Sequence, residues 1–190
     1  HTNTNDSRSA QEKLNKANDP FWKALNLARV ADDANRQMLA AEEANLVSRD
    51  LQQLKEEQSA MAEQIKSAGN DTNATERIAR RQSVAADETK SVEEQLNTLA
   101  EHASGGQEHS VRNMEKELSK QRENLEKALG GPDVIPAMET IKPPSEKLQR
   151  TVEDTANHMQ SVKRNLAQQA DNARERLQNE VGKAADVVAN

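Results

Sequence analysis

Apolar residues recur along most of this chain at steps of three and four positions. One such register runs from Leu27 to Ala68, and similar registers occupy three later stretches. This spacing places the apolar side chains on one stripe of an α-helix, which packs along its length on other helices. A few polar residues also take positions on these stripes: Gln58, Gln82, Thr89 and Gln121. No segment has the pattern of a β-strand, so the sequence predicts an all-α fold.

Helix start and stop signals divide the chain into four helices. Asp19 followed by Pro20 has the form of an N-cap and a first helical residue, and no helix breaker follows before Gly69. A helix over residues 20–68 would be roughly 73 Å long at 1.5 Å per residue, so we expect an elongated molecule. Residues 1–18 are polar, and we expect them to form a flexible N-terminal segment.

The remaining helices are bounded by glycine and proline. Asn73 with Glu76 has the spacing of a capping pair at the start of a second helix, and the diglycine Gly105-Gly106 separates that helix from a third. Residues 130–144 contain four of the five prolines, and they are predicted to form an irregular loop that packs on the end of the bundle. The last helix is predicted to run from near Ser145 to the end of the chain.

The diglycine determines the topology, and the sequence leaves two arrangements open. If it is only a kink, the chain forms a three-helix up-down-up bundle with its ends far apart. If the chain reverses there, the first and last helices run antiparallel and a shorter helical hairpin packs against them. We favour the reversal, because the predicted helix lengths leave a gap that the 130–144 loop can bridge. The expected fold is thus an elongated antiparallel helical bundle, a single domain over residues 19–190.

Composition supports long helices and argues against several classes of function. Hydrophobic residues make up 34%, charged residues 31% and aromatic residues 1% of the chain, which provides too few large apolar side chains for a compact globule. The net charge is −6 and basic residues are interleaved with acidic ones, so no nucleic-acid partner is expected. The chain has no cysteine and no apolar run near the ~20 residues of a membrane span.

Candidate catalytic and metal-binding residues are few. His102 and His109 flank the diglycine beside Glu101 and Glu108, and across a reversal their imidazole and carboxylate groups could hold a metal. Polar residues also gather at any exposed turn, and we favour that explanation. Adjacent glutamates point in different directions on a helix, and the chain has no glycine-rich phosphate loop. We therefore expect no catalytic residue, metal or cofactor, and no enzymatic activity.

Three Asn-x-Ser/Thr triplets are candidate N-glycosylation sites, at Asn5, Asn70 and Asn73. Two of them lie within four residues at the predicted turn after the first helix, which favours an extracellular surface. The alternative is that Asn and Thr serve there as cap and turn formers.

The aromatic residues, Phe21 and Trp22, stand side by side in the first turn of the predicted first helix. An amphipathic ring there could anchor the chain in a membrane or line a ligand pocket. We favour a packing role, in which Trp22 closes the end of the bundle against Leu25 and the final helix.

The alanine- and glutamate-rich, cysteine-free helices, separated by glycine turns, resemble the surface coat proteins of trypanosomes over residues 20–190. The most similar group is that of the glutamic acid/alanine-rich protein of Trypanosoma congolense and the related alanine-rich insect-stage proteins. The resemblance implies an extracellular helical bundle, attached to the membrane only through a C-terminal GPI anchor whose signal has been removed. It also implies neighbouring coat molecules or host and vector proteins as partners. The lack of cysteine departs from the related variant surface glycoproteins, and no functional residue is carried over.

These features favour a non-enzymatic cell-surface coat protein that forms a rod-like protective or host- and vector-interaction layer. Two other functions fit the same residues. An intracellular helical scaffold or spacer would bind other proteins along its faces, and a secretion signal in the full gene would exclude it. A receptor or carrier would hold a ligand at a site on the bundle, where a loosely filled, alanine-rich core leaves a cavity.

Overall fold

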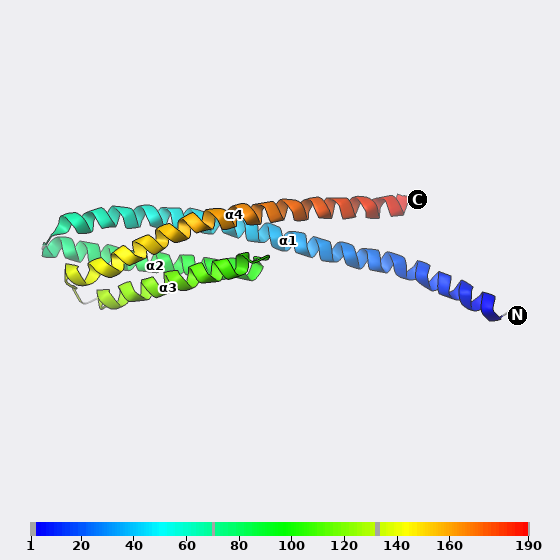
Figure 1. Cartoon of the computed structure of the whole chain (residues 1–190), viewed down its shortest axis with the longest axis horizontal. Helices are drawn as coiled ribbons and strands as arrows, with labels where there is room; N and C mark the ends of the chain where they lie inside the picture. The colour runs from blue at the N-terminus through cyan, green and yellow to red at the C-terminus, as the bar shows by residue number, and fades with distance from the viewer. Residues whose placement is uncertain (1–2, 70, 132–133, 190) are drawn as a thin grey trace. The chain divides into compact units, whose positions relative to one another are not determined.

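The computed structural model describes residues 3–69, 71–131 and 134–189, and side chains from residue 20 to residue 186 within those ranges. These residues form four α-helices in chain order (Figure 1): α1 (Asn3–Ala68), α2 (Thr72–His102), α3 (Gln107–Leu129) and α4 (Met138–Ala189). No strand occurs among the described residues. The predicted all-α bundle is confirmed, with two long helices, α1 and α4, and a shorter pair between them in the chain.

Contacts between Cα atoms group the chain into two compact units. The two-helix unit comprises His1–Met38 and Gln168–Asn190, and the four-helix unit comprises Leu39–Ala167. The boundary falls inside α1 and inside α4, so each long helix contributes to both units. The grouping shows which residues contact one another and does not define domains. The single domain expected over residues 19–190 therefore stays a prediction.

Side-chain pairs give the directions of the helices in the four-helix unit. Two pairs join α1 to α2 and two join α1 to α4: Gln64–Arg81, Asp50–Gln95, Ser48–Gln160 and Lys55–Glu153. In each set the residue number rises in one helix while it falls in the other. Both α2 and α4 are therefore antiparallel to α1 in this unit.

The chain reverses at Gly105 and Gly106, as predicted. Their φ angles are 62° and 83°, in the left-handed region that residues with a Cβ atom rarely adopt. The two helices on either side, α2 and α3, pack against each other (Figure 1). The alternative of a kink is excluded, and α2 and α3 form the short helical hairpin.

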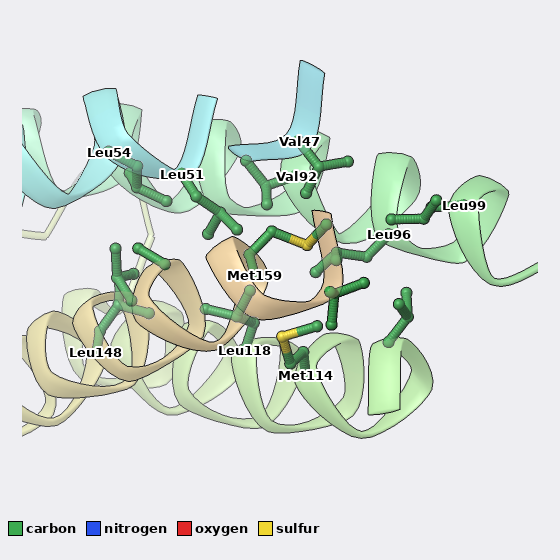
Figure 2. Close-up of a cluster of buried hydrophobic side chains, with 14 of the residues drawn as sticks. Val47, Leu51, Leu54, Val92, Leu96, Leu99, Met114, Leu118, Leu148 and Met159 are labelled. Carbon is green, nitrogen blue, oxygen red and sulfur yellow. The ribbon is translucent and has the colours of Figure 1, made fainter. Parts of the chain in front are cut away.

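The core of the four-helix unit brings together apolar side chains from all four helices (Figure 2). Leu51, Leu96, Leu118 and Met159 come one from each helix, and all four are completely buried. This is the packing that a seam at steps of three and four requires. Truncating such a leucine to alanine typically lowers the free energy of unfolding by about 2–5 kcal/mol.

The start of α1 differs from the prediction. The helix begins at Asn3 and contains Pro20, whereas the sequence predicts a start at Asp19. A proline inside a helix removes one backbone donor at a cost of about 3 kcal/mol, but its φ remains helical. Residues 10–14 (Ala, Gln, Glu, Lys, Leu) are strong helix formers and favour continuation. The flexibility expected of residues 1–18 stays a prediction.

The irregular loop expected over residues 130–144 is shorter, because α4 begins at Met138 and contains Pro143 and Pro144. The carbonyl groups that these prolines leave without a donor belong to exposed residues of the first turn, where water can replace the missing bond. Ile141 is completely buried, and its packing stabilises this part of the helix.

The expected cap of α2 is wrong, and the segment 130–144 packs on the bundle only in part. The N-cap of α2 is Asp71, whose Oδ1 accepts a hydrogen bond from the Asn73 backbone N–H at 2.9 Å. Asn73 therefore lies inside the helix and does not cap it. Of the apolar residues in the segment 130–144, Val134 and Ile135 are 52% and 55% exposed, whereas Ile141 is completely buried in the core, so the segment packs on the bundle through its later part.

Candidate functional site

The two histidines considered for a metal site have separate surroundings. The Nδ1 atom of His102 lies 2.9 Å from Oε2 of Glu43 on α1. His109 is exposed at the start of α3, where Glu108 pairs with Arg112 at 3.0 Å. Within the described ranges, no group of three or more His, Cys, Asp or Glu side chains is placed to hold a metal ion. His102 thus pairs with α1 across the α1–α2 interface, and the described residues around the turn form no such group.

Of the three candidate glycosylation sites, Asn73 is the one whose side chain the structure describes. It is exposed in the first turn of α2. The hydroxyl of Thr75, in the same triplet, donates to the backbone carbonyl of Asp71 at 2.9 Å. Asn70 and the side chain of Asn5 lie outside the described residues. A glycan on Asn73 would project into solvent beside the turn between α1 and α2.

Phe21 and Trp22 do not close the end of a bundle, contrary to the expectation. They are 63% and 59% exposed, and their rings meet edge to face with centroids 5.8 Å apart. Trp22 borders a hollow of about 290 Å³ that Glu180 of α4 also lines. The residues that α4 places at this hollow are Glu180, Lys183 and Ala184, which offer no large apolar side chain to cover an indole ring. The buried apolar residues described in the two-helix unit are all alanines: Ala34, Ala170 and Ala173.

A nearly buried ion pair joins α2 to α3. The Arg122 guanidinium donates to both carboxylate oxygens of Glu93, at 2.8 and 3.1 Å, and to Glu126 at 2.8 Å. The Arg122 and Glu93 side chains are 12% and 8% exposed. The hydrogen bond with Glu93 is the main cause that raises the pKa of Arg122 above its ordinary value. This bidentate geometry is strong and specific, and it holds the two helices together.

Two glutamates meet across the interface of α1 and α2. Burial, together with the hydrogen bond to Glu57 and its charge, raises the pKa of Glu88 to about 7. The same hydrogen bond lowers the pKa of Glu57. Carboxyl groups with divergent pKa values occur at acid–base sites. Here, however, no nucleophile or histidine lines the hollow that the pair shares with Met61 and Val84. The pair is thus a proton-sensitive contact between helices.

A polar groove of about 210 Å³ lies between α1 and α4 in the four-helix unit. Gln58 of α1 and Gln82 of α2 line it, with 1% and 0% of their surface exposed. In both residues the side-chain nitrogen and oxygen have no hydrogen-bond partner. Buried polar atoms in native proteins are satisfied in the large majority of cases, so these four atoms require an explanation.

The sequence identified the residues of these contacts only in part. Gln58, Gln82 and Thr89 could be assigned to the helix seams by their spacing. Glu126 stands four residues after Arg122, a spacing that signals an ion pair within a helix. The partners that come from other helices have no signal in the sequence, because they depend on the register between helices.

Within the part of the chain that the structure describes, no helix is both long enough and apolar enough to cross a membrane. Comparisons of the chain with protein-family models, with curated proteins and with solved structures give no match. The side chains described above are therefore the basis for assigning a function.

Proposed function

We propose that this chain is a non-enzymatic cell-surface coat protein whose neighbouring copies stand side by side. The supporting observation is the distribution of charge on the four-helix unit. Acidic and basic residues pair within single helices, three or four positions apart: Glu63–Lys66, Glu76–Arg80, Glu108–Arg112, Glu117–Lys120 and Glu123–Lys127. Interspersed charges keep a surface well hydrated and limit the repulsion between like copies to that of the net charge of −6.

Two further features agree with a coat. Asn73, in a glycosylation triplet, is exposed beside the turn between α1 and α2, and glycans attach to such surface positions in secreted proteins. The ionisable groups in partly buried positions, such as Glu93 and Glu43, pair with residues of another helix. They join one helix to another, which agrees with a structural role. The resemblance in composition to trypanosome coat proteins supports the same location.

Surface labelling of intact cells tests this proposal. Antibodies raised against the chain are applied to intact and to permeabilised cells of the organism that encodes it. We expect labelling of intact cells, and its loss after treatment with phosphatidylinositol-specific phospholipase C, because the resemblance implies a GPI anchor. Labelling that requires permeabilisation would overturn the proposal and favour an intracellular scaffold.

Glycan attachment gives a second, independent measurement. In the same cells, Asn73→Gln is expected to increase the electrophoretic mobility of the protein, because it removes an attachment site that faces solvent. Asn97→Gln is the matched control, since Asn97 is exposed on the same helix but lies in no triplet. If the two variants migrate alike, Asn73 carries no glycan and its triplet serves as turn sequence.

A further inference from the structure

The groove between α1 and α4 combines charged and buried polar residues that the proposed coat function does not require. It is lined by the charged residues Lys66 of α1 and Glu146 and Arg150 of α4, and by the buried Gln58 and Gln82. Its volume of about 210 Å³ is below the roughly 300–1,000 Å³ of pockets for drug-sized ligands. The groove therefore suits a solute about the size of an amino acid.

Gln58 and Gln82 occupy core positions at which an apolar residue would be more stable. Gln58 stands seven residues after Leu51 and seven before Ile65, and both of these residues are buried, as a heptad seam predicts. An unsatisfied buried polar group costs about 1–3 kcal/mol, a cost that leucine at the same position would avoid. Two such glutamines beside one groove indicate that their partner comes from outside the helices.

Other buried polar side chains of the four-helix unit find partners within it. Thr89 donates to the carbonyl of Ala85 at 2.7 Å, and Gln121 donates to Glu117 at 2.8 Å. Among the described side chains, Gln58 and Gln82 are the residues in which both amide atoms lack a partner. The buried amide atoms that lack a hydrogen-bond partner are thus concentrated at the groove.

The polar groups around the groove define the chemistry of a ligand. A glutamine carboxamide offers two N–H donors and an oxygen acceptor, which complements the N–H and C=O of another amide. Arg150 is exposed on the rim, and a guanidinium binds a carboxylate through paired hydrogen bonds. The amides of Gln58 and Gln82 are closed to solvent. Rotation about their side-chain torsions would turn them into the groove without a change in the backbone.

We propose that this groove binds a small solute that carries both an amide and a carboxylate, such as an N-acylated amino acid. The amide of the solute pairs with the carboxamides of Gln58 and Gln82, and its carboxylate pairs with the guanidinium of Arg150. This binding function goes beyond the proposed coat function and does not depend on it.

Nuclear magnetic resonance titration of the whole ¹⁵N-labelled chain tests the proposal with three probes. N-acetylglycine carries both groups, acetamide carries only the amide, and acetate carries only the carboxylate. We expect N-acetylglycine to shift the side-chain NH₂ signals of Gln58 and Gln82 in a saturable way. Its affinity should exceed that of either single-group probe by about tenfold or more, because the two contacts act together.

Variants at the groove assign the binding. Gln58→Leu and Gln82→Leu are expected to abolish saturable binding. Arg150→Gln should weaken it about threefold to tenfold, since a contact on the rim is screened by solvent. Gln121→Leu replaces a buried glutamine away from the groove and is the matched control, with binding unchanged. Circular dichroism verifies that each variant is folded, and Arg150→Gln changes an exposed position that the fold does not require.

Three results would overturn the inference. The first is the absence of any saturable shift with N-acetylglycine, in which case the buried amides are hydrated by water. The second is an equal affinity for all three probes. The third is binding that survives both glutamine replacements, which would place the ligand elsewhere on the chain.

Discussion

Glu88 links the stability of the α1–α2 interface to pH. Its pKa is raised from 4.5 to about 7 in the folded chain, mainly by burial and then by the hydrogen bond to Glu57. The folded chain therefore binds this proton more tightly than the unfolded chain does. The stability that the proton contributes is complete below about pH 4.5 and is lost as the pH rises through about 7. The lowered pKa of Glu57 has the opposite effect, and only below pH 4.5.

Glu88→Gln is expected to reduce this loss of stability between about pH 5 and pH 8. Glutamine keeps a donor toward Glu57 but releases no proton. Urea unfolding at both pH values measures the effect, and the wild-type chain should lose more stability on going to pH 8 than the variant. Glu94→Gln, at an exposed position of the same helix, should follow the wild type. If the wild type and Glu88→Gln show the same pH dependence, Glu88 does not hold a proton toward Glu57 in the folded chain.

Replacing a buried glutamine with leucine should stabilise the chain where the amide has no partner. Gln82→Leu is expected to raise the free energy of unfolding by about 1–3 kcal/mol, because it removes two unsatisfied atoms from the core. Gln121→Leu is the control and should give no gain, since it breaks a hydrogen bond to Glu117. Thermal unfolding without added solute provides the comparison. A lower melting temperature for Gln82→Leu would mean that the amide is satisfied by bound water.

Residue spacing predicts that the seam glutamines are buried, but it does not predict whether their amides find hydrogen-bond partners. Gln58, Gln82 and Gln121 all follow the seam steps of three and four, so each was expected inside. Gln121 meets a partner on its own helix, which sequence separation can reveal. Whether Gln58 and Gln82 find partners depends on how α4 packs beside α1, and that register is set by tertiary packing.

At the scale of elements, the Arg122 ion pair is expected to hold the α2–α3 hairpin. Arg122→Ala would leave the carboxylate of Glu93 buried without a counter-charge, at 8% exposure. Removing one partner of a buried pair typically costs about 3–5 kcal/mol. Lys127→Ala breaks an exposed pair with Glu123 on the same helix and should change stability by less than about 1 kcal/mol. Urea denaturation measures both variants, and similar losses would contradict a special role for Arg122.

The sequence predicts the helix boundary at the glycines Gly105 and Gly106 correctly but misplaces the boundaries at the prolines. Gly105 and Gly106 adopt positive φ angles, and a helix ends at such residues regardless of what packs around it. Pro20 and Pro143 each remove one backbone hydrogen bond, and a helix tolerates that loss when its remaining contacts outweigh it. The complete burial of Ile141 beside Pro143 is such a contact. Sequence rules weigh the proline alone, so they placed the starts of these helices too late.

At the scale of the whole molecule, the main hydrophobic core belongs to one of the two units. Every residue of the main apolar cluster lies between Ala40 and Leu166, inside the four-helix unit. The buried apolar side chains described for the two-helix unit are alanines. Burial contributes roughly 25 cal/mol per Å² of apolar surface, so small side chains contribute little. The two units should therefore differ in their resistance to unfolding.

A fragment that contains residues 39–167 is thus expected to fold without the rest of the chain. It retains the whole apolar cluster and the Arg122–Glu93 pair. Its thermal unfolding should be cooperative, with a midpoint within a few degrees of that of the full chain. In the full chain, amide hydrogens of residues 20–38 and 168–186 should exchange faster than those of residues 44–61, because local opening there exposes less apolar surface. A fragment that fails to unfold cooperatively, or uniform exchange along α1, would show that the two units are stabilised as one.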